Sequence, residues 1–130
     1  MDNATNPRSK VSILIVDDNT MVLGLIKMVL EDMDFLVDTA GTAKQAMACI
    51  DERRGLFDLV ILDQQLPDSR GIDMMRRVKE QYPALRFMMV SGLMTEDVIQ
   101  EIKDAGGESV LGKPFDVAEL MTAVEKALGE

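Results

Sequence analysis

Two apolar stretches of the chain end in acidic residues. Asp17 and Asp18 follow residues 11–16, and Asp63 follows residues 59–62. Carboxylates that lie close together repel one another unless a positive charge offsets them, and sites built from oxygen ligands select a hard divalent cation. If the fold brings these two ends together, the three side chains are predicted to form a site for Mg²⁺.

A serine and a lysine follow two further apolar stretches. Ser91 comes directly after residues 86–90, and Lys113 comes two residues after residues 109–111. Phosphoryl transfer depends on positioning and charge neutralisation, and it uses a carboxylate nucleophile, a metal ion, a cationic side chain and a hydroxyl donor. Asp63 fits the role of nucleophile, Lys113 that of the cation and Ser91 that of the hydroxyl donor.

These groups meet only in a particular kind of fold. The apolar stretches are short and rich in β-branched residues, which is typical of strands covered on both faces, and stretches of helical periodicity separate them. We expect strands over residues 11–16, 35–40, 59–62, 86–90 and 109–111. Five such strands alternating with five helices predict one doubly wound α/β parallel sheet, in which the carboxyl ends of the strands share an edge.

Capping residues mark where the helices begin. Asn19 or Thr20 is expected to cap a helix over residues 20–32, and Thr42 followed by Gln45 is a capping-box pattern. The third helix carries apolar residues at helical spacing and ends before a proline, and the fourth and fifth helices each follow a capping residue. These positions are Ile72, Met75, Val78 and Pro83 for the third helix, Thr95 for the fourth and Asp116 for the fifth.

Composition excludes several classes of protein. The chain has 130 residues, 23 acidic against 14 basic, and a formal charge of -9, which opposes direct binding to nucleic acid or to an anionic membrane. There is no histidine, so His-ligated zinc, Ser-His-Asp catalysis and an internal phosphohistidine are excluded. Cys49 is the single cysteine, which excludes a disulfide within the chain.

The first ten residues are polar and contain no apolar run typical of a signal peptide. We therefore expect a flexible tail over residues 1–10, one folded domain over residues 11–130 and a reducing, cytoplasmic setting. A basic cluster, Arg70, Arg76, Arg77 and Lys79, is interpreted as the solvated outer face of the third helix.

Four motifs occur in a fixed order along the chain. They are ILIVDDN at 13–19, LVILDQQLPD at 59–68 with Gly71, VSG at 90–92 and KPF at 113–115. Through these motifs the sequence resembles the receiver domain of two-component response regulators over residues 11–128. The resemblance implies a flavodoxin-like strand order of 2-1-3-4-5.

The resemblance also implies a function and a set of partners. Asp63 would accept a phosphoryl group from a sensor histidine kinase or a phosphotransfer protein, in a reaction that requires Mg²⁺. The modified domain would then act on a downstream protein target or output domain, or form a homodimer. The domain would be a signalling module and not chiefly an enzyme, with slow self-catalysed loss of the phosphoryl group.

Each site residue has a role by the same resemblance. Asp17 or Asp18 would bind the metal directly or through water, the backbone carbonyl of Gln65 would complete the metal shell, and Ser91 and Lys113 would each bond a phosphoryl oxygen. The Lys113–Pro114 peptide bond would be cis.

One position departs from the family pattern. The family usually has Tyr or Phe three residues before the lysine, and this chain has Val110. Valine has no ring to turn inward on activation, so a phosphate-independent adaptor with the same fold is the alternative function. A nucleotide-binding or phosphohydrolase enzyme ranks lowest, because the glycine-rich phosphate-binding patterns are missing from the sequence.

Overall fold

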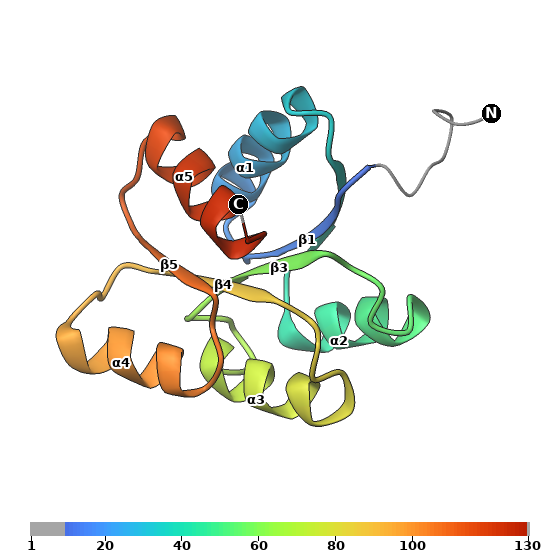
Figure 1. Ribbon diagram of the computed structural model, residues 1–130, viewed down its shortest axis with the longest axis vertical. Helices are drawn as coiled ribbons and strands as arrows, with labels where there is room; N and C mark the ends of the chain where they lie inside the picture. Colours follow the sequence, from blue (N-terminus) through green and yellow to red (C-terminus); the bar gives the residue numbers. More distant parts are fainter. Residues whose placement is uncertain (1–9, 130) are drawn as a thin grey trace.

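A parallel five-stranded sheet lies at the centre of the molecule (Figure 1). In this computed structural model, which describes residues 10–129, the strand order is β2-β1-β3-β4-β5 and every neighbouring pair is parallel. The strands are β1 (Ser12–Val16), β2 (Leu36–Ala40), β3 (Leu59–Asp63), β4 (Phe87–Ser91) and β5 (Ser109–Gly112). The predicted fold class and strand order are confirmed.

Helices cover both faces of the sheet (Figure 1). Helices α1 (Thr20–Asp32) and α5 (Val117–Ala127) lie on one face. Helices α2 (Ala43–Glu52), α3 (Gly71–Gln81) and α4 (Glu96–Asp104) lie on the other. Each strand is therefore joined to the next by one helix, as the alternating pattern predicted.

Two apolar layers, one on each face of the sheet, explain the uninterrupted apolar strands. On β1, Ile13 and Ile15 pack toward α1 and α5, whereas Leu14 and Val16 pack toward α2 and α3. All four side chains are buried. Because successive side chains of a strand point to opposite faces, a strand between two helix layers must be apolar at every position.

Four of the five helices in residues 10–129 begin next to the predicted capping residues, and α3 has no side-chain cap. The side chain of Asn19 accepts hydrogen bonds from the backbone N–H groups of Met21 and Val22, and Thr42, Thr95 and Asp116 cap α2, α4 and α5 in the same way. The capping box predicted at α2 forms only in part, because Gln45 reaches the N–H of Gly41 and not that of Thr42.

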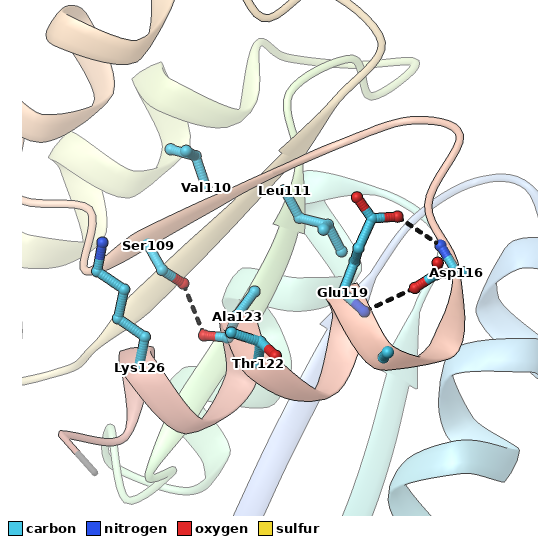
Figure 2. Close-up of a pocket in the computed structure, with 9 residues that line it drawn as sticks. Ser109, Val110, Leu111, Asp116, Glu119, Thr122, Ala123 and Lys126 are labelled. Carbon is cyan, nitrogen blue, oxygen red and sulfur yellow. Dashed lines mark hydrogen bonds between the residues drawn. The ribbon is translucent and has the colours of Figure 1, made fainter.

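A complete capping box instead starts α5 (Figure 2). Glu119 donates its backbone N–H to Asp116, and its side chain accepts from the N–H of Asp116. Each side chain thus accepts the backbone N–H of the other residue, at the point where the chain turns from the sheet edge into the helix.

The strand ends differ from the sequence-based expectation by one residue. Asp63 and Ser91 are the last residues of β3 and β4, because the ladder continues through their pairs with Val90 and Gly112. The backbone of both residues is therefore fixed by the sheet. The Lys113–Pro114 peptide bond beyond β5 is cis.

The flexible tail expected over residues 1–10 lies outside the described residues, apart from Lys10. Among residues 10–129, every helix is too short or too polar to cross a lipid bilayer.

Two glycines should respond in opposite ways to the same added methyl group. At Gly71, the first residue of α3, that methyl group would lie 2.5 Å from the carbonyl oxygen of Asp63. At Gly24, within α1, it would meet nothing within 4 Å. We expect Gly71→Ala to lower the free energy of unfolding by about 1–3 kcal/mol. Gly24→Ala should raise it by about 0.5–1 kcal/mol, because alanine restricts the unfolded chain and favours a helix.

Urea denaturation of both variants beside the unsubstituted protein tests this pair of expectations. An equal effect of the two substitutions would contradict the backbone contact at Gly71.

Candidate functional site

The carboxyl ends of β1, β3 and β5 border one cavity of about 420 Å³. Its lining includes all three acidic residues that were predicted to bind the metal, together with the lysine and the glutamine. The lining residues are Asp17, Asp18, Asn19, Asp63, Gln65, Leu66, Pro67, Gly92 and Lys113. The parallel sheet therefore brings together residues that lie almost a hundred positions apart in the chain.

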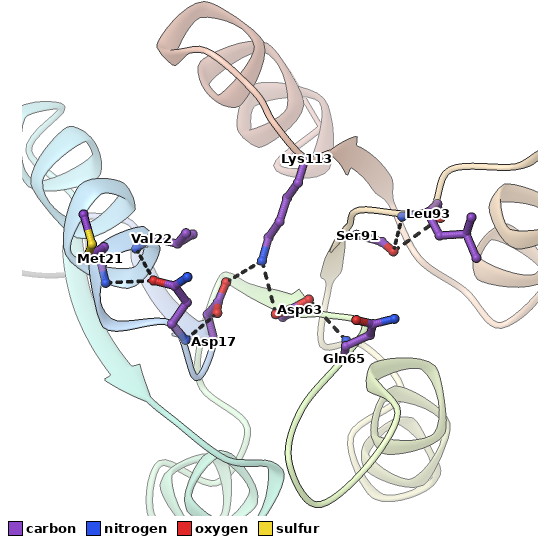
Figure 3. Close-up of polar contacts among 9 residues, drawn as sticks. Asp17, Met21, Val22, Asp63, Gln65, Ser91, Leu93 and Lys113 are labelled. Carbon is purple, nitrogen blue, oxygen red and sulfur yellow. Dashed lines mark hydrogen bonds and ion pairs between the residues drawn. The ribbon is translucent and has the colours of Figure 1, made fainter.

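Lys113 joins two of the carboxylates (Figure 3). Its Nζ atom lies 3.1 Å from Oδ2 of Asp17 and 3.3 Å from Oδ2 of Asp63. Asp17 is only 3% exposed and Asp63 only 7%, so both ion pairs are shielded from bulk water. Pairs of this kind are stronger than surface pairs, because water screens them less.

The three carboxylates form a group that suits a metal ion. Asp17, Asp18 and Asp63 each offer one oxygen, and these oxygens all lie within 4.8 Å of one another. Lys113 supplies one positive charge against three negative charges, so the cluster keeps a net negative charge. Asp18 is exposed, unlike its two neighbours, and it leaves the cluster accessible to a hydrated cation from solvent. A donor set of oxygens alone fits a hard divalent cation.

Backbone N–H groups fix the two buried carboxylates. Oδ1 of Asp17 accepts from the N–H of Asn19 at 2.8 Å, and Oδ1 of Asp63 accepts from the N–H of Gln65 at 3.2 Å. In both cases the second oxygen faces Lys113. Each carboxylate is thus held between its own loop and the lysine, which orients it toward the cavity.

The pKa of Asp63 is raised above its ordinary value of 3.8. Burial is the main cause, and the negative charge of Asp17 adds to it, while the N–H of Gln65 and the charge of Lys113 act in the opposite direction. Burial by itself would lower the pKa of Lys113, but its hydrogen bonds to Asp17 and Asp63 and their charges outweigh burial and raise it. The lysine therefore stays charged, whereas ionised Asp63 gains from additional positive charge.

Ser91 lies at the neighbouring strand end but is turned toward its own loop. Its side chain is buried, and Oγ donates to the carbonyl of Leu93 at 3.3 Å and accepts from the N–H of Leu93 at 3.1 Å (Figure 3). The predicted hydroxyl donor is therefore at the expected position in the fold. To bond a group on Asp63, the hydroxyl would have to leave Leu93.

The sequence did not indicate a role for Asp68. Its carboxylate accepts from the N–H groups of Ala43 at 2.9 Å and Lys44 at 3.0 Å, which are the first residues of α2. These hydrogen bonds lower the pKa of Asp68. Asp68 thereby ties the loop that follows Asp63 to a helix 25 residues earlier in the chain.

A second cavity, of about 400 Å³, lies between β5 and α5 (Figure 2). Three of its polar residues are already engaged in hydrogen bonds: Ser109 donates to the carbonyl of Ala123, and Asp116 and Glu119 form the capping box. In Figure 2, Val110 points to the opposite face of the sheet from this cavity. The clustered carboxylates and the lysine therefore make the first cavity the candidate site.

The chain is similar to known proteins along most of its length. It matches the Response regulator receiver domain over residues 13–125. It is 32% identical over 120 residues to the DNA-binding transcriptional regulator NtrC of Azospirillum brasilense, which covers 92% of this chain and 24% of that protein. It is 34% identical over 128 residues to the aerobic respiration control sensor protein ArcB of Escherichia coli, which covers 96% of this chain and 16% of that protein.

This chain therefore spans a quarter or less of the length of these two relatives. A crystal structure of a CheY-like response regulator receiver domain protein from Methanospirillum hungatei has the same fold. The two structures superpose with a TM-score of 0.83 at 28% identity, over 92% of this chain and 94% of the other.

The raised pKa of Asp63 predicts a pH dependence of stability. Between pH 3.8 and the raised pKa, the folded protein binds more protons at Asp63 than the unfolded chain does. The contribution of Asp63 to the free energy of unfolding is therefore complete below this window and is lost as the pH rises through it. We expect the difference in free energy of unfolding between the unsubstituted protein and Asp63→Asn to fall with rising pH across the window.

Urea denaturation of the two proteins at a series of pH values, with a chelator present, measures this difference. A difference that grows with pH would mean that the ion pair with Lys113 outweighs burial at Asp63.

Proposed function

Because the chain belongs to the response regulator receiver domain family, we propose that Asp63 accepts a phosphoryl group from a histidine of a partner protein. The observation that carries the proposal is the bridge that Lys113 makes between two buried carboxylates at the carboxyl edge of the sheet. This bridge places a nucleophile beside a fixed positive charge, in a cavity open to a donor.

In the proposed reaction, an oxygen of Asp63 attacks the phosphorus of a phosphohistidine. The O–P bond forms, the N–P bond breaks, and the electron pair of that bond stays on the histidine nitrogen, which takes a proton from solvent. Lys113 faces the negative charge that accumulates on the transferring group. Ser91, once released from Leu93, would donate its hydroxyl to one of the phosphoryl oxygens.

Asp17, Asp18 and Asp63 fit a Mg²⁺ ion, and Gln65, whose backbone carbonyl would complete the metal shell, lines the same cavity. When bound, Mg²⁺ supplies charge neutralisation for an acidic nucleophile and an anionic substrate. The chain's own residues keep the nucleophile oriented, since the N–H of Gln65 and the Nζ of Lys113 hold one oxygen of Asp63 each.

The resulting acyl phosphate is the proposed signal, and slow hydrolysis by water returns the domain to its resting state. The domain, proposed to comprise residues 11–130 in a cytoplasmic setting, would then bind a protein target, an output domain or a second copy differently in the two states. A sensor histidine kinase or a phosphotransfer protein would be the donor. The alternative, a phosphate-independent adaptor, rests on Val110.

An exposed apolar face on α1 supports a protein partner next to the site. Met21, Leu25 and Met28 lie on one side of the helix, and all three are exposed. The helix begins three residues after Asp17. A donor protein that covers the site would also cover this face and remove it from water.

Phosphorylation by a small donor tests the nucleophile. On incubation with Mg²⁺ and acetyl phosphate, intact mass spectrometry should show the gain of one phosphoryl group. Asp63→Asn or a chelator should abolish the gain, because the nucleophile or the metal is then missing. Asp32→Asn, an exposed aspartate at the end of α1, serves as the matched control and should be phosphorylated normally.

Uptake of phosphoryl by Asp63→Asn would refute the assignment of the site. Failure of the unsubstituted protein with Mg²⁺ bound and a donor kinase supplied would favour the adaptor.

Metal binding can be tested without phosphoryl chemistry. We expect Asp18→Asn to weaken the affinity for Mg²⁺ by about tenfold or more, because one of three clustered charges is lost. Titration calorimetry measures this affinity. The fold should persist, since Asp18 is exposed. Unchanged affinity in this variant would exclude Asp18 from the metal site.

A further inference from the structure

An ion-pair cluster connects the start of α3 to α4. The Nη2 atom of Arg70 lies 3.3 Å from both carboxylate oxygens of Glu101, and Nη2 of Arg76 lies 3.7 Å from Oε2 of the same residue. Glu101 lies on α4, 31 residues after Arg70. Arg70 and Arg76 are about half exposed, as expected for a solvated outer face of α3, but both side chains also contact the neighbouring helix.

The backbone of Arg70 belongs to the loop that holds Asp63. Arg70 forms an antiparallel bridge with Gln65, whose N–H in turn donates to Oδ1 of Asp63. The next residue, Gly71, donates its N–H to the carbonyl of Gln64 at 2.7 Å. Only two contacts, the bridge and the hydrogen bond from Gln65, thus separate Arg70 from the acceptor carboxylate.

A cavity of about 270 Å³ lies between this loop and α4. Its lining combines residues of the loop with the serine, one residue of the connection to α4 and one residue of α4 itself. These residues are Gln64, Gln65, Arg70, Ser91, Leu93 and Val98. The space lies on the α4 side of Ser91, where Leu93 holds the hydroxyl. A change in the Ser91–Leu93 contact therefore alters a cavity that Arg70 also lines.

We propose that Arg70 is a positioning residue, whose ion pair with Glu101 keeps α4 in the arrangement in which Ser91 bonds Leu93. The inference rests on the proposed function, because Ser91 has to leave Leu93 to bond a phosphoryl group. Leu93 lies three residues before α4. In this proposal, a movement of Leu93 that accompanies its release is passed to the start of the helix. The ion pair opposes that displacement and so stabilises the unphosphorylated state.

This contact offers a path to α4 that needs no aromatic residue on β5. Val110 is half-buried on the face of the sheet that α4 covers. Its side chain has no aromatic ring that could turn inward on activation. Glu101 and Arg70 are both partly exposed. The ion pair therefore adds only modestly to the stability of the unphosphorylated state, because water and salt weaken it. A weak contact of this kind suits an interaction that has to break.

The test measures binding of beryllium fluoride, which forms a phosphoryl-like adduct on carboxylates, in the presence of Mg²⁺. Arg70→Gln and Glu101→Gln should each bind it about two- to fivefold more tightly than the unsubstituted protein, the range that an exposed ion pair supports. The double variant should bind no more tightly than Glu101→Gln alone, because both substitutions remove the same contact.

Glu108→Gln provides the matched control, because Glu108 is an exposed glutamate just beyond α4 with no ion pair among residues 10–129. Its affinity for beryllium fluoride should equal that of the unsubstituted protein. At 1 M salt the Arg70→Gln and Glu101→Gln variants should converge on the unsubstituted protein, since charges at this exposure are then screened. A merely structural role of Arg70 would not vanish with salt.

Two outcomes overturn the inference and are distinguishable. If the unsubstituted protein binds beryllium fluoride but the variants bind it equally or less tightly, or the two effects add, the positioning role of Arg70 is refuted and the proposed function stands. If the folded, unsubstituted protein with Mg²⁺ does not bind beryllium fluoride, the proposed function fails, and the inference fails with it.

Discussion

The carboxylates at one edge of the sheet repel one another, and the other groups of the site are arranged so that they offset this repulsion. Asp17 and Asp63 are buried within reach of the same lysine, and Asp18 adds a third negative charge at the solvent side. Lys113, brought from the far end of the chain by β5, offsets part of this charge. Backbone N–H groups offset a further part, and the remainder makes the site receptive to a cation.

The sheet tolerates these clustered charges because its central strands are apolar over most of their length. The central strands β1, β3 and β4 are apolar along most of their length and are buried between two helix layers. Polar residues are confined to the ends, where Asp63 and Ser91 still belong to the ladder. The burial that stabilises the domain therefore also fixes the distance between its reactive groups.

The sequence predicted the position of the site much better than its contacts. Strand and helix periodicity are local patterns, so the sheet and the meeting of Asp17, Asp63 and Lys113 followed from the positions of the strand ends. The contacts of Asp68 with α2 and of Arg70 with α4 join segments 25 and 31 residues apart through exposed side chains, and no local pattern predicts such partners.

The orientation of the Ser91 side chain could not be predicted from the sequence either. Its place at the end of β4 was predicted within one residue, but the choice of Leu93 as its partner depends on the path of the following loop. Local patterns describe backbone elements and say little about a hydroxyl that has several nearby acceptors.

The loop after Asp63 is fastened at two points, to α2 by Asp68 and to α4 by Arg70. Both helices lie on the same face of the sheet (Figure 1). The side-chain contacts that fasten this loop therefore all lie on one side of the sheet, so a change in the loop would first reach the helix layer that contains α2, α3 and α4.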